Sequence, residues 1–448
     1  MVRRGAEAAL AVRKECAYNR EMAEAGVPGQ LLSLYLHIPF CQVRCAYCDF
    51  NTYAGLGDLI APYARALVKE VQMVGEASRG AEERGAVHTI FFGGGTPSLL
   101  PTELHAEIFA ALREAFELTP DCEITLEANP GTVSRAYLQG LRELGVNRLS
   151  FGVQSSHPHE LRLLDRLHLF GDAAQAVTWA RAAGFENLNL DLIYGIPHQT
   201  LGMWQATLNR VLALGPEHLS AYALSLEHGT PMRAWVYRGL LPMPDPDLAA
   251  EMYEWASEAL EKNGYVQYEI SNWARGEKPE VRSERSEIGS RKSEDAKSDL
   301  GPLTSNLHYA CRHNLQYWRN LPYLGFGAGA HGYMHDWRYS NVLAPTAYIE
   351  RIGQADKADF PFSPAVAQAT PTTPDETMGE TMMLGMRLTR EGVGDDIFRE
   401  RFGLGLGEKY PRELRRLKAL GLIEWDSTGA RLTKQGRLLG NRVFREFV

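Results

Sequence analysis

The sequence predicts an α/β fold: a partial barrel of six strand–helix units, followed by a C-terminal helical, winged-helix-like domain. Short apolar, β-rich runs alternate with longer amphipathic stretches from about residue 33 to residue 230. This alternation is typical of a parallel sheet with right-handed crossovers. A closed barrel of this type has eight units, and a doubly wound open sheet stays an alternative.

The predicted elements follow in order along the chain. We expect strands at residues 33–38, 88–92, 123–127, 148–153, 187–193 and 218–225. We expect helices between them at residues 59–74, 102–115, 135–144, 172–183 and 203–214. In either arrangement, ligands bind at the carboxyl ends of the strands.

Five segments are predicted. They are an N-terminal extension (1–32), the partial barrel (33–275), an insertion (276–304), a barrel completion (305–374) and the C-terminal domain (375–448). The insertion is rich in Glu, Lys, Arg and Ser and has almost no large apolar residues, so we expect it to be disordered. The chain end reads as helix, short hairpin, helix.

Composition restricts the class of protein. The formal net charge is −8, which gives no support for broad nucleic-acid binding. No stretch approaches the roughly 18–20 apolar residues of a membrane span. Arg13, Lys14 and Glu15 interrupt the apolar run near the N-terminus, where a secretory signal needs about 7–15 apolar residues. We therefore expect a cytoplasmic protein.

A DNA-binding regulator is a distant alternative. The C-terminal segment carries Arg412, Arg415, Arg416 and Lys418, which could face phosphate. A solvated helix face explains the same residues and is the commoner case.

Three of the six cysteines form a cluster motif directly after the first predicted strand. Cys16, Cys122 and Cys311 are scattered, and six cysteines are too sparse for a disulfide scaffold. Cys41, Cys45 and Cys48 have the spacing C-x3-C-x2-C. Three thiolates can ligate three irons of a 4Fe–4S cluster and leave the fourth iron open, here for the amino and carboxylate groups of S-adenosylmethionine (SAM). A zinc site is the alternative, but it needs four protein ligands and no second pair follows nearby.

Polar residues at the ends of the other strands suit a bound SAM. Gly93–Gly95 and Thr96 follow the second strand, and Glu127, Gln154 and Asp191 lie at the ends of the next three. Carboxylate and amide oxygens accept hydrogen bonds from a ribose diol or an ammonium group, and Arg166 could pair with a carboxylate. Each residue alone is explained as a cap or a surface polar group, but together they converge on one site.

Six motifs resemble one known family. They are YLHIPFCQVRCAYCDF, FFGGGTPS, LEANPGT, NRLSFGVQS, NLDLIYGIP and ACRHNLQYW. They are similar to the radical SAM family of oxygen-independent coproporphyrinogen III oxidases and, more closely, to their heme-chaperone relatives, the HemW group. The resemblance implies a partial radical SAM barrel with cluster ligands at Cys41, Cys45 and Cys48. It implies SAM contacts at Tyr35, Tyr47, Gly94, Gly95, Thr96, Glu127, Gln154, Arg166, Asp191, Ser225 and Ala330.

One position separates the two branches of that family. The oxidases have the motif C-x3-C-x2-C-x-C, in which a further cysteine stands two residues after the third. Phe50 occupies that position in this sequence, as a phenylalanine does in the chaperone group. The resemblance thus implies a heme chaperone that transfers heme to an apo-hemoprotein, with an electron donor such as flavodoxin or ferredoxin. The alternative is an oxidase that converts propionates to vinyl groups by decarboxylation, and whether the chain is an enzyme stays open.

The HNLQYW motif resembles the heme-binding signature of the chaperone group. Its residues are His313, Asn314, Tyr317 and Trp318. A neutral imidazole is a common axial ligand of heme iron, and the two aromatic rings could stack on a porphyrin. Neighbours with possible roles are Arg312 or Arg319 for propionates, Cys311 as a thiol partner, and His308, Tyr309 and His331 as alternative contacts. A core-packed aromatic pair with a hydrogen-bonded histidine also explains the motif.

Overall fold

The computed structural model describes residues 31–79, 85–276 and 307–448. The extension predicted for residues 1–32 and the disordered insertion predicted for 276–304 lie outside the described residues, apart from Leu31, Leu32 and Gly276. None of the helices in the described ranges has the length and apolar character needed to span a membrane.

Six parallel strands form the centre of one curved sheet. They are β1 (Leu32–Ile38), β4 (Val87–Gly94), β5 (Leu118–Ala128), β6 (Arg148–Gln154), β7 (Asn187–Tyr194) and β8 (His218–Ala223). Each strand pairs in parallel with the next one in this series. All six predicted strands are confirmed, and their carboxyl ends meet at one edge of the sheet.

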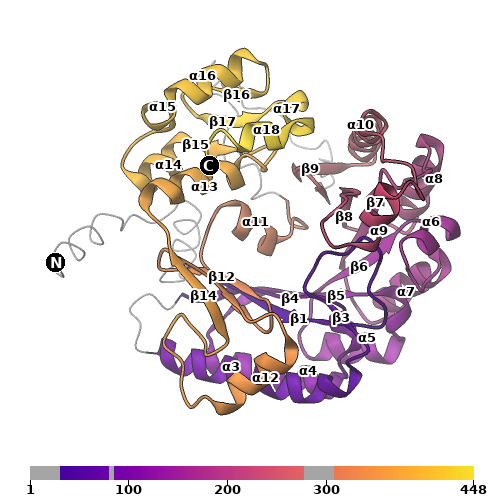
Figure 1. The fold of residues 1–448 in the computed structure, drawn as a ribbon, viewed down its shortest axis with the longest axis vertical. Helices are drawn as coiled ribbons and strands as arrows, with labels where there is room; N and C mark the ends of the chain where they lie inside the picture. Colours follow the sequence, from indigo (N-terminus) through magenta and orange to yellow (C-terminus); the bar gives the residue numbers. More distant parts are fainter. Residues whose placement is uncertain (1–30, 80–84, 277–306) are drawn as a thin grey trace, which may run out of the picture.

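Helices cover the outer face of this sheet (Figure 1). The five predicted helices are α3 (Ile60–Ser78), α4 (Thr102–Ala115), α5 (Arg135–Glu143), α7 (Phe170–Ala182) and α8 (Leu201–Leu212). Hydroxyl caps start two of them, since Ser134 accepts from the N–H of Tyr137 and Thr200 accepts from that of Met203. Further helices are α6 (Pro158–Leu163), α9 (Pro231–Tyr237), α10 (Pro246–Lys262) and α12 (Pro345–Gln354), with 3-10 turns at Gly57–Leu59, Pro97–Leu99 and Pro130–Thr132.

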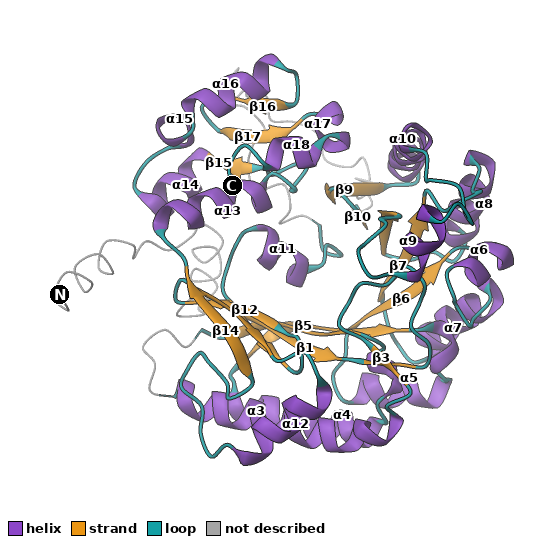
Figure 2. Cartoon of the chain, viewed as in Figure 1, coloured by secondary structure: helices purple, strands orange, loops and turns teal. Residues whose placement is uncertain are grey.

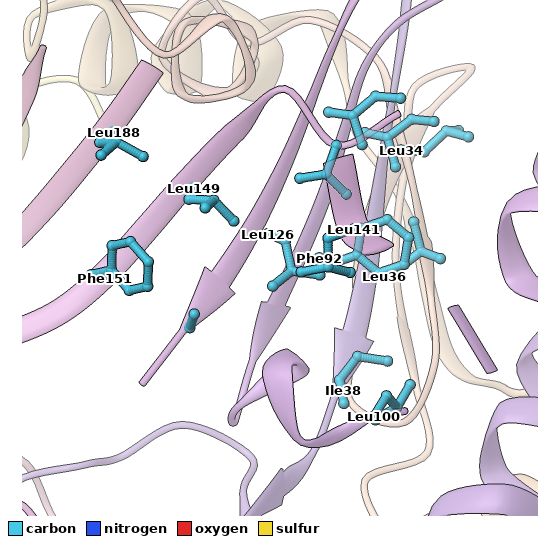
Figure 3. Packing of buried hydrophobic residues seen from close by; sticks show 14 of the residues in the cluster. Leu34, Leu36, Ile38, Phe92, Leu100, Leu126, Leu141, Leu149, Phe151 and Leu188 are labelled. Carbon is cyan, nitrogen blue, oxygen red and sulfur yellow. The ribbon is translucent and has the colours of Figure 1, made fainter. Parts of the chain in front are cut away.

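The two faces of the central strands carry different side chains. Apolar residues of successive strands pack under the helices and are fully buried, among them Leu34, Leu36, Phe92, Leu126 and Leu149 (Figure 3). Each such side chain contributes about 1.5–3 kcal/mol on burial. The alternate residues are buried but polar, among them Ser33, Thr89, Glu123, Arg148 and Asn189. Because side chains alternate across a strand, these polar groups face the inside of the barrel.

The sheet continues past the six predicted strands on both sides. On one side, β11 (Tyr323–Phe326) pairs in parallel with β1 and is followed by the antiparallel strands β12 (His331–Met334), β13 (Trp337–Asn341) and β14 (Val366–Pro371). On the other side, β10 (Asn272–Arg275) pairs antiparallel with β8, and β9 (Tyr265–Glu269) pairs antiparallel with β10. In the described part of the sheet, the edge strands β14 and β9 do not pair with each other, so the barrel is partial.

A short helix, α11 (Arg312–Trp318), lies on the concave side of the sheet (Figure 2). It contacts β4 of the barrel and α13 (Pro374–Gly385), the first helix of the C-terminal unit. The HNLQYW motif therefore lies between the barrel and the C-terminal unit.

The C-terminal unit has its own hydrophobic core, formed by residues such as Met382, Leu414 and Leu432. After α13 come β15 (Val393–Gly394), α14 (Asp395–Phe402), α15 (Leu406–Lys409), α16 (Pro411–Ala419), β16 (Ile423–Trp425), β17 (Gly429–Leu432), α17 (Lys434–Leu438) and α18 (Gly440–Phe444). The three strands form a small sheet in the order β15-β17-β16. The predicted helix, hairpin and helix at the chain end correspond to α16, β16–β17 and α17.

Candidate functional site

The three clustered cysteines lie on one loop after β1. Cys41 ends β2 (Phe40–Cys41), which pairs with β3 (Tyr53–Ala54), and the N–H of Cys48 donates to the carbonyl of Cys45 at 3.1 Å. All three thiols are free and half-buried. The loop thus presents three sulfur ligands that are not used in disulfides.

Two of the three sulfurs accept a hydrogen bond from a side chain. The Thr96 hydroxyl donates to Cys41 Sγ and the Arg166 guanidinium donates to Cys45 Sγ, both at 3.6 Å. Burial raises the pKa of the Cys41 and Cys48 thiols, and the neighbouring thiols add to the effect. Within the described ranges, no three His, Cys, Asp or Glu side chains are arranged around one position for a single metal ion. A cubane cluster does not need such a group, because each thiolate ligates a different iron.

The cysteines open into a cavity of about 400 Å³, which we call the thiol cavity. This volume is within the usual range for a small-molecule site, about 300–1,000 Å³. Besides the cysteines, its wall includes the predicted SAM contacts Tyr47, Gly94, Gly95, Thr96, Glu127, Gln154, Arg166, Asp191 and Ser225. The structure therefore brings these residues together around one space.

Gly94 allows the backbone to approach this space closely. Its φ is +108°, and a Cβ added there would lie 2.5 Å from the His37 imidazole. Its N–H donates to Glu127 at 3.2 Å, and the N–H of Gly95 donates to the carbonyl of Ile38 at 2.8 Å. Only glycine fits this conformation and this spacing.

Two half-buried carboxyl groups face the thiol cavity. Burial, with Asp191 nearby, raises the pKa of Glu127 to about 8. Burial also raises the pKa of Asp191, while the side chains of Ser150 and Asn189 donate to its oxygens at 2.9 and 2.8 Å. These carboxyl groups can accept hydrogen bonds from an ammonium group or a ribose diol.

Arg166 is the cation of the thiol cavity. It donates to the carbonyl of Gly152 at 2.6 Å, and its buried Nε has no hydrogen-bond partner among the described residues. Gln154 lies beside it with a φ of +66°, an uncommon conformation for a residue other than glycine. Such backbone positions cluster at functional sites. The guanidinium suits the carboxylate of a bound amino acid.

The other two predicted SAM contacts lie elsewhere. Tyr35 faces a second cavity of about 610 Å³, where its hydroxyl lies 3.1 Å from His37 Nδ1. Ala330 is buried in the turn between β11 and β12 and does not line the thiol cavity.

We call this second space the motif cavity, because Tyr317 and Trp318 line it. Its wall also includes Tyr35, His37, Asn51, Asn320, Leu321, Tyr323, Gly329, His331, Arg338, Leu343 and Leu384. Asp49, Phe50, Gly94 and Glu127 line both cavities. The two spaces therefore adjoin along the cluster loop and the Gly94–Glu127 contact.

His313, one of the four predicted heme contacts, is enclosed in the barrel. Its Nδ1 is 2.7 Å from the Thr89 hydroxyl, its Nε2 is 2.9 Å from the Tyr317 hydroxyl, and its ring stacks on Phe91. Burial, with His88 and Arg148 nearby, lowers the pKa of His313 to about 3. Its side chain is therefore neutral, but both nitrogens are engaged. Asn314 lines neither the thiol cavity nor the motif cavity.

Several neighbours of the motif line a different space. His308, Tyr309, Arg312, Trp318 and Arg319 line a third space of about 600 Å³ between the barrel and the C-terminal unit, which we call the junction cavity. Arg312 pairs with Asp121 at 2.7 Å and Arg319 pairs with Glu391 at 2.9 Å. Cys311 is fully buried, and its thiol donates to Glu123 at 3.6 Å.

Three of the four basic residues of α16 make contacts within the chain. Arg416 pairs with Glu446, Lys418 donates to the carbonyl of Trp425, and Arg415 donates to that of Pro411. These contacts favour the interpretation as a solvated helix face over a phosphate-binding surface.

Some residues of these cavities were not predicted from the sequence. His37 lines the motif cavity and Tyr222 lines the thiol cavity. Both residues stand near the carboxyl ends of predicted strands. The rule that ligands gather at strand ends could have found them. No sequence signal identifies Asn189, because it acts through the hydrogen bond that it donates to Asp191.

Comparison with known families agrees with this geometry. The Radical SAM superfamily profile matches residues 35–211, and the HemN C-terminal domain profile matches residues 372–439. The first match spans the cluster loop and the strands whose ends line the thiol cavity, and the second falls within the C-terminal unit.

Curated relatives extend over nearly the whole chain. The heme chaperone HemW of Bacillus subtilis (strain 168) is 36% identical over 417 residues, which cover 93% of this chain and 99% of that protein. The heme chaperone HemW of Mycobacterium tuberculosis (strain ATCC 25618 / H37Rv) is 36% identical over 94% of this chain and 96% of that protein. Among solved structures, the coproporphyrinogen III oxidase HemN from Escherichia coli has a TM-score of 0.72 at 24% identity, covering 94% of this chain and 90% of that chain. That likeness concerns the fold.

Proposed function

Because this chain belongs to the radical SAM superfamily and, within it, to the family of the heme chaperone HemW, we propose that it binds heme and hands it to an acceptor protein. The proposal includes a SAM-ligated 4Fe–4S cluster in the thiol cavity. Heme is the cargo, and an apo-hemoprotein is its acceptor.

One observation carries the cofactor assignment: three free thiols and nine of the eleven predicted SAM contacts line the same cavity. Cys41, Cys45 and Cys48 would hold three irons of the cluster, and the fourth iron would stay open to SAM. When bound, the cluster and SAM supply one-electron reducing chemistry, for which a flavodoxin or ferredoxin is the proposed electron donor.

The protein's own residues would orient SAM in this cavity. Arg166 offers its guanidinium to the carboxylate of the methionine part, and the unpartnered Nε supports this role. Glu127 and Asp191 offer acceptors to the ammonium group and the ribose diol. Tyr47 and the Gly94–Gly95 backbone close the space around them.

The motif cavity supports the heme part of the proposal. It adjoins the thiol cavity and is lined by the rings of Tyr317, Trp318 and Tyr323. A flat, apolar porphyrin gains from contact with aromatic rings. A cargo bound there would lie next to the SAM site.

The alternative function is oxygen-independent coproporphyrinogen oxidation. The oxidases have cysteines with the spacing C-x3-C-x2-C-x-C, and this chain has Phe50 at the position of the last cysteine. Phe50 is 63% exposed and lines both the thiol and the motif cavities. An apolar ring at this position favours the chaperone proposal.

Parallel assays on one preparation test the choice. The protein is reconstituted anaerobically with iron and sulfide, titrated with hemin, and assayed for loss of coproporphyrinogen with SAM and a reductant. We expect saturable hemin binding without consumption of coproporphyrinogen. Turnover of coproporphyrinogen without hemin binding would contradict the proposal and favour the oxidase.

A further inference from the structure

The motif cavity is lined by two chemically different groups of side chains. One group is aromatic and apolar, with Tyr317, Trp318 and the exposed side chains of Phe50 and Leu343. The other group is polar and includes His331 and Arg338. Such a lining fits a flat molecule that carries a metal ion or charged substituents.

Three histidines lie at or beside this cavity, and in two of them both ring nitrogens are engaged in hydrogen bonds within the fold. His37 has its Nδ1 at 3.1 Å from the Tyr35 hydroxyl and its Nε2 at 2.9 Å from the carbonyl of Asn51. His313 has both nitrogens engaged by Thr89 and Tyr317. Neither ring can turn toward a ligand without losing two hydrogen bonds.

His331 differs from both. Its side chain is exposed in the motif cavity, and no hydrogen bond of its ring to any residue in the described ranges is observed. An imidazole with an available nitrogen lone pair is a common axial ligand of heme iron.

The backbone holds His331 firmly. His331 starts β12 and pairs with Ser340 of β13. A Cβ at Gly325 would collide with the carbonyl oxygen of His331, so a glycine at that position permits the tight approach of β11 to the start of β12.

The turn before His331 is also tied to the cluster loop. Asn51, three residues after Cys48, donates to the carbonyls of Ala328 and Leu343 at 3.1 and 2.9 Å. The position of His331 is therefore coupled to the loop that carries the thiols.

Arg338 is the cationic residue among those that line the motif cavity. It pairs with Glu380 at 2.6 Å and donates to Asn320 at 2.6 Å, and its side chain keeps 30% exposure. A guanidinium held in this way can also meet a carboxylate substituent of the ligand.

We propose that His331 is the axial ligand of the heme iron, with the porphyrin lying against Tyr317 and Trp318 in the motif cavity. This inference rests on the proposed function and deepens it by naming the iron ligand. It moves that role away from His313, whose ring instead holds Tyr317 in place.

His331→Gln and His331→Gly test this assignment in the full chain. Hemin affinity should fall by about 10- to 100-fold or more, since even outer partners of a metal ligand contribute that much. The Soret band should shift in both variants, and free imidazole should restore the wild-type spectrum of His331→Gly. The matched control is His308→Ala, which changes an exposed histidine of the junction cavity and should keep the wild-type spectrum and affinity.

The outcomes distinguish a failure of the His331 assignment from a failure of the proposed function. If both His331 variants keep the wild-type Soret band and hemin affinity, or if His308→Ala loses them, the assignment of His331 is wrong. If the wild-type protein itself binds no hemin, the proposed function fails and the assignment fails with it. Cluster iron content and circular dichroism, measured on each variant, should match wild type, and His331→Gln keeps a side chain in β12 if the glycine variant unfolds.

Discussion

The chemistry of the thiol cavity depends on single side chains that the fold holds at the strand ends. Glu127 and Asp191 stand two strands apart in the sheet, on β5 and β7, and both point into the barrel. Their positions could be predicted, because parallel strands place their carboxyl ends at one edge. The state of His313 could not be predicted, because its partner Thr89 comes from a distant strand. The motif suggested a ligand, whereas the structure shows a ring with both nitrogens engaged.

The raised pKa of Glu127 predicts a pH effect on stability. The pKa is about 8 in the fold against a usual 4.5, so the folded chain holds more protons than the unfolded chain between these values. Stability is therefore lost as the pH rises through this window. Glu127→Gln cannot ionise, and we expect its apo form to lose less stability than wild type between pH 4.5 and 8.

Urea unfolding of the apo-protein at several pH values in that window measures this effect. Glu107→Gln is the matched control, because Glu107 is an exposed carboxylate on α4 and should leave the wild-type slope unchanged. Equal slopes for Glu127→Gln and wild type would show that Glu127 ionises normally in the fold.

At the scale of elements, α11 connects the barrel to the C-terminal unit. His313 bonds to Thr89 of β4, and Gln316 lies 3.0 Å from His88 of the same strand. At the far end, Arg319 pairs with Glu391, which follows α13. The helix has only seven residues, so these contacts rather than its own hydrogen bonds stabilise it. Its side chains also separate the motif cavity from the junction cavity, and Trp318 lines both.

This role predicts that His313 matters for stability. His313→Ala removes a buried ring and takes away the hydrogen-bond partner of the Tyr317 hydroxyl. We expect the free energy of unfolding to fall by roughly 2–4 kcal/mol. His308→Ala, an exposed change five residues away, should stay within about 0.5 kcal/mol of wild type. Chemical denaturation of the two variants side by side would contradict this account if their losses were equal.

For the whole molecule, strand and helix alternation was enough to predict the central sheet. Apolar residues at every second position, as in β1, identify the face that packs under the helices. The extension by β11 to β14 and by β9 and β10 was not predicted as strands, because these strands are short, and β11 joins the sheet only through β1, which lies far away in the sequence. His331 belongs to this extension, so its place in the motif cavity could not be inferred from strand ends. The thiol cavity, by contrast, is built from the predicted strands and the cluster loop.

The central claim is that three thiolates hold a 4Fe–4S cluster and leave one iron open to SAM. Iron and acid-labile sulfide, measured after anaerobic reconstitution, test it most directly. We predict about four irons and four sulfides per chain. Cys45→Ala should lose most of this content, and Cys122→Ala, which changes a buried cysteine of β5, should retain it. Zinc in place of iron and sulfide, or an unchanged iron content in Cys45→Ala, would contradict the account.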